Sequence, residues 1–169
     1  YREQGFTKAC MEVSSHALSQ HRVDSIAFRQ ALFTNLTLDH LDYHHTMEAY
    51  AAAKAQLFMR EELECAIINN DDRYHQLIQA AVKPQIRKLT YGIDNPADIR
   101  ATHWQMDLHG THIDVESPWG KHSLHIKALG KFNIYNSLAV FASLLVSGYA
   151  PEHVVSTMAE LRAAPGRLE

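Results

Sequence analysis

The sequence has few cysteines, no long apolar run and no block of charge of one sign. Its two cysteines, Cys10 and Cys65, lack the close spacing of metal ligands, so we expect buried free thiols in a reducing cytoplasm. No apolar stretch reaches the roughly 18 residues that a membrane-spanning helix needs. The basic residues are scattered and the formal net charge is −3, which argues against binding to nucleic acid.

The remaining composition is that of a globular protein. The chain has 169 residues, of which 46% are hydrophobic and 21% charged, enough for one domain, or one domain and part of another. Apolar runs predict strands at residues 9–13, 31–34 and 65–69. Helix patterns lie between and after them, at residues 14–20, 47–62 and 71–82, with Thr46 as the cap of the second helix. This alternation predicts a mostly parallel α/β sheet flanked by helices.

The pattern changes after Pro84. Short alternating runs at 88–92, 100–108, 111–116 and 123–127 are separated by turn residues, which predicts a small antiparallel β meander within residues 85–128. Helices are predicted at 133–147 and from Pro151 to about residue 163, because Pro favours the first turn of a helix.

Polar residues follow the first two predicted strands. Glu12 comes at the end of one, and His40 lies between Asp39 and Asp42 after the other. Ligands bind at the carboxyl ends of parallel strands, and an acid there holds Mg²⁺ in nucleotide enzymes. An imidazole between carboxylates can bind a metal or orient a phosphate. The ordinary alternatives are an exposed strand-end acid and a loop histidine that is hydrogen-bonded to backbone.

Other candidates are weaker on composition alone. Lys54, one turn after Tyr50, has the pattern of a solvated helix lysine. Four polar residues near the first helix could hold a phosphate and a sugar, although capping and surface polarity also explain them. They are Ser14, Gln20, His21 and Arg22. Asn133 and Asn136, near a helix start, could cap it or read a base edge.

Seven motifs occur in one order along the chain. They are Glu-Val-Ser-Ser-His at 12–16, Gln-His-Arg at 20–22, Thr-Asn-Leu-x-x-Asp-His-Leu-Asp-Tyr-His at 34–44, Tyr-x-Ala-Ala-Lys at 50–54, Ile-Ile-Asn-x-Asp-Asp at 67–72, Gly-x-Phe-Asn-x-x-Asn at 130–136 and Gly-Arg-Leu-Glu at 166–169. In this order they resemble the Mur ligases, most closely the MurE branch that forms the UDP-MurNAc-tripeptide. The resemblance covers nearly the whole chain.

The resemblance implies a magnesium and nucleotide site. Glu12 and His40 would be Mg²⁺ ligands beside the γ-phosphate of ATP. Lys54 would be carbamylated to N6-carboxylysine, which changes a cation into an anion that can hold a second Mg²⁺. Asn136 would contact adenine, with Asn133 beside it.

It also implies a substrate site. Arg167 would bind the ATP phosphates, and Ser14, Gln20 and Arg22 would bind the UDP-sugar dipeptide. Asp39, with Asn35, would support the metal-binding loop.

The implied reaction is an ATP-dependent ligation in peptidoglycan synthesis. ATP would phosphorylate the terminal carboxylate of UDP-MurNAc-L-Ala-D-Glu, and the amine of meso-diaminopimelate or L-lysine would then displace phosphate. Metal and positive groups would neutralise the charge that develops on the phosphoryl oxygens. We expect a cytoplasmic enzyme that is monomeric in its full form, with no nucleic-acid partner.

The chain also departs from the family pattern. The phosphate-binding loop, the N-terminal UDP-binding domain and the C-terminal domain are absent, so we expect the 169 residues to be part of the central ATP-binding domain and inactive alone. Asp94-Asn95-Pro96 is similar to the family's diaminopimelate motif but is interpreted as a turn, since Ala97 replaces its Arg. The alternatives are a folylpolyglutamate- or cyanophycin-type ligase, a non-catalytic binding module, and a histidine-dependent metal hydrolase.

Overall fold

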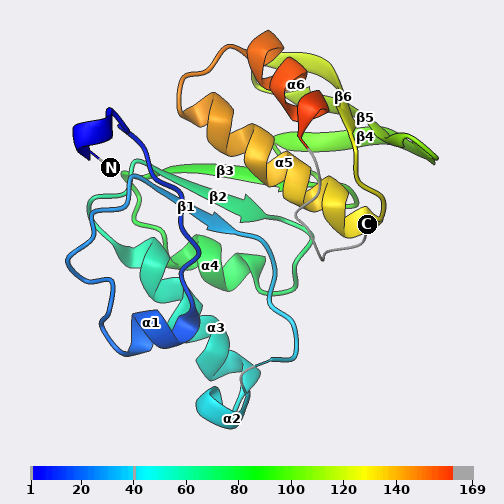
Figure 1. The fold of residues 1–169 in the computed structure, drawn as a ribbon. Coiled ribbons are helices and arrows are strands. Elements are labelled where there is room, and N and C mark those ends of the chain that lie inside the picture. Colours follow the sequence, from blue (N-terminus) through cyan, green and yellow to red (C-terminus); the bar gives the residue numbers. More distant parts are fainter. Residues whose placement is uncertain (1, 40, 162–169) are drawn as a thin grey trace.

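The computed structural model describes residues 2–39 and 41–161, which form one six-stranded sheet with helices on both faces (Figure 1). The strands lie side by side in sequence order. The strands are β1 Gln30–Phe33, β2 Cys65–Asn69, β3 Arg87–Gly92, β4 Ile99–Asp107, β5 Gly110–Ser117 and β6 Gly120–Ile126. β1 to β4 pair in parallel, whereas β4, β5 and β6 pair antiparallel. The predicted mixed α/β class is therefore confirmed.

The helices divide between the two faces of the sheet (Figure 1). On one face lie α1 Ser15–Ser19, α2 Leu41–His44, α3 Met47–Ala55, the 3-10 helix η2 Gln56–Met59 and α4 His75–Ala81. On the other face lie α5 Lys131–Val146, which packs on β1 to β4, and α6 Pro151–Glu160, which packs on β6. A short 3-10 helix, η1, covers Arg2–Gln4. Among the described helices, none combines the length and the apolarity that crossing a bilayer would require.

Strand β2 is buried on both faces and joins the two cores. Its residues alternate, because successive side chains in a strand point to opposite faces. Cys65 and Ile67 pack in the core under α5, whereas Ala66 and Ile68 pack in the core under α3 and α4. A continuous apolar strand is the expected pattern for a parallel sheet covered on both sides.

Residues 9–13, predicted as a buried strand, form no strand in the structure. The segment is irregular and mostly exposed, and Met11 is 50% accessible to solvent. The prediction that both thiols are buried is also wrong, since Cys10 is exposed and Cys65 is buried. An apolar run becomes a strand only where a neighbouring strand pairs with it. Among the described strands, the edge strand β1 pairs with β2 alone, so residues 9–13 have no strand partner in the sheet.

The antiparallel meander is shorter than predicted. Its expected range begins at residue 85, but β3 pairs with β2 in parallel from Cys65↔Arg87 to Asn69↔Tyr91. The antiparallel part therefore starts with β4, at Ile99. The predicted start is wrong because alternation alone does not reveal the direction of a neighbouring strand. Two helices also differ: α3 gives way to η2 at Gln56, and α4 begins only at His75.

Asp71, which follows β2, holds the connection between the parallel strands β3 and β4. Its carboxylate accepts backbone N–H bonds from Ile93 (2.6 Å), Asp94 (2.9 Å) and Asn95 (2.7 Å), in the loop between β3 and β4. The Tyr135 hydroxyl donates a further bond of 2.9 Å from α5. One side chain thus holds the loop and the helix, and Asp94-Asn95-Pro96 lies in a bend between the strands, as interpreted from the sequence.

Two further observations show how closely this carboxylate is enclosed. A Cβ atom added to Gly92 would lie 3.1 Å from Asp71 Oδ2, so a larger residue there would push the carboxylate by a few tenths of an ångström. Burial alone would raise the pKa of Asp71, but the three backbone donors and the Tyr135 hydroxyl outweigh it and lower that pKa.

We predict that Asp71→Asn lowers the free energy of unfolding at pH 7 by about 2 kcal/mol, because an amide nitrogen would face backbone donors. A folded-state pKa below the ordinary 3.8 means that this stabilisation is present above that value and is lost as the pH falls through the folded pKa. Urea unfolding at several pH values checks this, with Glu160→Gln as an exposed control. A difference that persists unchanged at acidic pH would contradict the carboxylate's role.

Candidate functional site

Lys54 is held near the end of α3. The Thr46 hydroxyl caps this helix by accepting the Ala49 N–H at 3.1 Å, which confirms the predicted cap. Ala53 and Ala55, on either side of Lys54, are buried, so the helix backbone lies close to its neighbours. The Lys54 side chain is consequently half-buried and is not the solvated lysine that composition alone favours.

The structure brings Lys54 and Glu12 into electrostatic contact. Burial lowers the pKa of Lys54, and the nearby Glu12 carboxylate opposes that effect in part. Glu12 itself is exposed, in the irregular segment just before α1. A half-buried amine whose pKa is lowered has a larger neutral fraction, and the neutral form is the one that reacts with CO₂. A neutral Lys54 amine fits a carbamate, and only a carbamate, together with Glu12, would fit a divalent cation.

The third candidate metal ligand, His40, lies outside the described residues. Next to it, Asp39 is exposed and acts on Tyr50: burial, and secondarily the Asp39 charge, raise the pKa of Tyr50. Within residues 2–39 and 41–161, no three His, Cys, Asp or Glu side chains gather in a group that could hold a metal. Of the three candidate metal ligands, the described residues thus include two, Glu12 and Lys54.

Ser14, Gln20 and Arg22 lie around α1. Ser14 is the N-cap, and its hydroxyl accepts the Ala17 N–H at 3.1 Å. Gln20 Oε1 accepts two bonds from the Arg22 guanidinium, at 3.0 Å from Nε and 2.7 Å from Nη2. His21 between them has a φ of 57°, which turns the chain so that the two side chains meet. The result is an oriented guanidinium on an exposed surface, a suitable group for a phosphate or a carboxylate.

Asn133 and Asn136 lie together at the start of α5. The cap position is Gly130, so the expectation that Asn133 is the N-cap is wrong; its Nδ2 instead donates to the Leu129 carbonyl at 2.8 Å. Both asparagines line a hollow of about 140 Å³ whose apolar wall includes Ile126 and Met158. Arg167, expected near the nucleotide phosphates, lies outside the described residues.

Two residues at the end of β2 have a role that the sequence does not reveal. Asn69 Nδ2 donates to the Thr34 carbonyl at 2.7 Å, and Asp72 Oδ2 accepts the Leu36 N–H at 2.9 Å. They fix the loop that follows β1 and leads to Asp39. The only signal in the sequence is their position after a buried strand, where polar residues are usually interpreted as helix caps.

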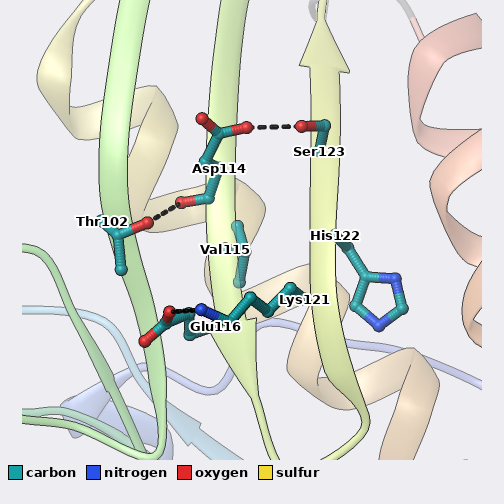
Figure 2. Close-up of a pocket in the computed structure, with 7 residues that line it drawn as sticks. All are labelled: Thr102, Asp114, Val115, Glu116, Lys121, His122 and Ser123. Atoms are coloured by element: carbon teal, nitrogen blue, oxygen red, sulfur yellow. Dashed lines mark hydrogen bonds and ion pairs between the residues drawn. The ribbon is translucent and has the colours of Figure 1, made fainter.

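A larger hollow, of about 370 Å³, lies on the β4–β6 meander and contains none of the predicted site residues. Figure 2 shows its lining: Ser123 donates to Asp114, and Lys121 pairs with Glu116 at 2.5 Å. These groups satisfy one another across neighbouring strands, as expected for the solvated face of an antiparallel sheet. We therefore place the candidate site at α1, α3 and the start of α5.

Comparison with known proteins identifies the family of this domain. The sequence matches the Mur ligase middle domain family over residues 1–144. The UDP-N-acetylmuramoyl-L-alanyl-D-glutamate--2,6-diaminopimelate ligase of Neisseria meningitidis serogroup B is 43% identical over 100% of this chain and 35% of its own length. The ligase of the same name from Chromobacterium violaceum is 42% identical, over 100% and 34%. The chain thus spans about a third of the length of these curated relatives.

Solved structures give the same result. A UDP-N-acetylmuramoyl-L-alanyl-D-glutamate--2,6-diaminopimelate ligase superposes with a TM-score of 0.93 at 36% identity, over 99% of this chain and 35% of that one. A MurF from Acinetobacter baumannii superposes with a TM-score of 0.77 at 21% identity, over 85% and 31%, which shows a shared fold alone. The family match over most of the sequence shows that this chain belongs to the Mur ligase middle-domain family.

Proposed function

We propose that this chain is the greater part of the ATP-binding domain of a ligase that joins a diamino acid to UDP-MurNAc-L-Ala-D-Glu. The observation that carries the proposal is Lys54, half-buried in an alanine-rich helix beside Glu12, within a sequence 43% identical to a 2,6-diaminopimelate ligase. We propose 2,6-diaminopimelate as the incoming amino acid because the relatives bear that name. Lysine is the alternative that the assay below tests.

The chemistry is a phosphoryl transfer followed by an acyl transfer. The substrate carboxylate attacks the γ-phosphorus of ATP, forming an acyl phosphate and releasing ADP. The amine of the diamino acid then attacks the acyl carbon, an amide bond forms, and phosphate leaves with the electrons of the broken C–O bond. Both steps bring anionic oxygens together, so they need positive groups placed in advance.

The residues of this chain would hold those reactants. Arg22, oriented by Gln20, would bind an anionic group of the UDP-sugar dipeptide, and Asn136 would contact the adenine of ATP. Glu12, carbamylated Lys54 and His40 would hold Mg²⁺, which when bound neutralises the phosphoryl oxygens. These substrates are cytoplasmic metabolites, so we propose a cytoplasmic location for the protein.

We predict that the full-length protein releases phosphate when given UDP-MurNAc-L-Ala-D-Glu, Mg-ATP and 2,6-diaminopimelate. Lysine in place of diaminopimelate should give at least about tenfold less, because a site built for a second carboxylate is left with unpaired polar groups. The 169-residue chain alone, as a control, should release none. Phosphate release with lysine only would overturn the specificity, and release with neither amino acid would overturn the function.

We predict that Lys54 in the full-length protein carries CO₂. The neutral Nζ attacks CO₂, an N–C bond forms and one proton leaves, so at a fixed CO₂ concentration the carbamate should decrease as the pH falls and Nζ is protonated. A carbonyl signal from ¹³C-bicarbonate, absent in Lys54→Arg, checks this by NMR. Lys127→Arg, an exposed lysine on the meander, is the matched control. Full activity without added or dissolved CO₂ would contradict it.

We predict that Arg22→Lys raises the KM for the UDP-sugar dipeptide about tenfold and changes kcat little. Lysine keeps the positive charge but lacks the planar guanidinium, with its several N–H donors, that Gln20 orients. Steady-state kinetics measure both constants, and Arg29→Lys, an exposed arginine paired with Glu64, serves as the control. A fall in kcat at constant KM would assign Arg22 to the chemical step instead.

A further inference from the structure

One buried histidine, His44, lies among the segments that supply the candidate metal ligands. It is the last residue of α2 and is 8% exposed. Its Nε2 lies 2.8 Å from the hydroxyl of Ser15, the first residue of α1, which is 1% exposed. At that distance one atom donates a hydrogen bond to the other, and the tautomer of the imidazole decides which.

The His44 ring is also held by aromatic neighbours. It stacks on Tyr50 of α3, with ring centroids 5.2 Å apart and planes 14° apart. Tyr43 meets it edge to face, with centroids 4.8 Å apart, and the His16 ring lies at 5.6 Å. The hydrogen bond holds Nε2 of the imidazole, and the stacking on Tyr50 holds the plane of the ring, so the two contacts together set the position of the ring.

Each contact of His44 lies close in sequence to a candidate metal ligand. Ser15 is three residues after Glu12, and Tyr50 is four residues before Lys54, one turn of the same helix. His44 itself is four residues after His40. A shift of this ring would therefore move the segments of Glu12 and Lys54 relative to each other.

We propose that His44 is a positioning residue that sets the distance between the Glu12 segment and Lys54, through Ser15 on one side and Tyr50 on the other. The inference rests on the proposed function, because it concerns the metal site of that reaction. Both Ser15 and His44 are buried, so the proposed role acts through the segments they join. A Ser–His pair at 2.8 Å has the spacing of a catalytic nucleophile and its general base. Ser15, however, is only 1% exposed and is not placed to attack a substrate.

A purely structural role would give a different result from a positioning role. His44→Phe keeps the aromatic stack and leaves the Ser15 hydroxyl buried without this partner, whereas Ser15→Ala does the reverse. The double variant removes both members of the Ser15–His44 hydrogen bond. If only an unsatisfied polar group matters, the double variant recovers the properties of the wild type. If the bond positions the ligands, cation binding remains weak in all three variants.

The experiment uses the full-length protein with Mn²⁺ as a probe for the Mg²⁺ site, followed by electron paramagnetic resonance. We expect each variant to bind Mn²⁺ about tenfold to a hundredfold more weakly than the wild type, which is the usual cost of losing a residue that orients metal ligands. The ¹³C carbamate signal of Lys54 should fall in parallel. His45→Asn is the matched control: His45 is exposed with a φ of 63°, which Asn tolerates, and its Mn²⁺ affinity should be unchanged.

The outcomes separate this inference from the proposed function. Wild-type Mn²⁺ affinity and carbamate signal in a folded Ser15→Ala or double variant would overturn the positioning role, even if the protein ligates diaminopimelate. Weakened Mn²⁺ binding in the variants of a protein that fails to ligate would support the positioning role and overturn the function alone. A wild-type protein that binds no Mn²⁺ would overturn both. If His44→Phe does not fold, wild-type Mn²⁺ affinity and carbamate signal in Ser15→Ala still overturn the positioning role.

Discussion

The carboxyl end of β2 is the constraint on which the rest of the molecule depends. The strand is buried on both faces and paired on both edges, so the sheet holds it independently of the loops. Polar side chains at its end and just after it bond to backbone elsewhere. Asn69 and Asp72 hold the loop after β1, and Asp71 holds the loop after β3. Polar groups at this edge thus satisfy loop backbone that the sheet itself does not pair.

Much of the fold is predictable because hydrophobic period and capping are local signals. The apolar run at 65–69 predicts β2 at its observed bounds, and Thr46 caps α3 as expected. The errors in the strands have one cause, since pairing is not local. Residues 9–13 have the composition of a strand but no described strand pairs with them, and β3 alternates like a meander strand but pairs in parallel with β2.

The sequence names candidate site residues but does not give their geometry. Motif order indicates Glu12 and Lys54, the strand predicted before Glu12 is not formed, and composition gives no reason to expect a half-buried lysine. Its burial comes from alanines on either side, which let α3 approach its neighbours, an effect that only the packed structure shows. The hydrogen bond of Asn69 to the Thr34 carbonyl is likewise invisible in the sequence, because it joins residues 35 positions apart.

Helix α1 joins the residues proposed to bind substrate to those proposed to bind a cation. Ser14 caps the helix and Ser15 bonds to His44, so the first turn of α1 is held beside the segments of the candidate metal ligands. The end of the same five-residue helix leads directly to Gln20 and Arg22. A helix this short has little freedom to bend between its ends. Arg22 and the Ser15–His44 hydrogen bond therefore lie at the two ends of one short element, so a movement of α1 when an anion binds at Arg22 would reach both.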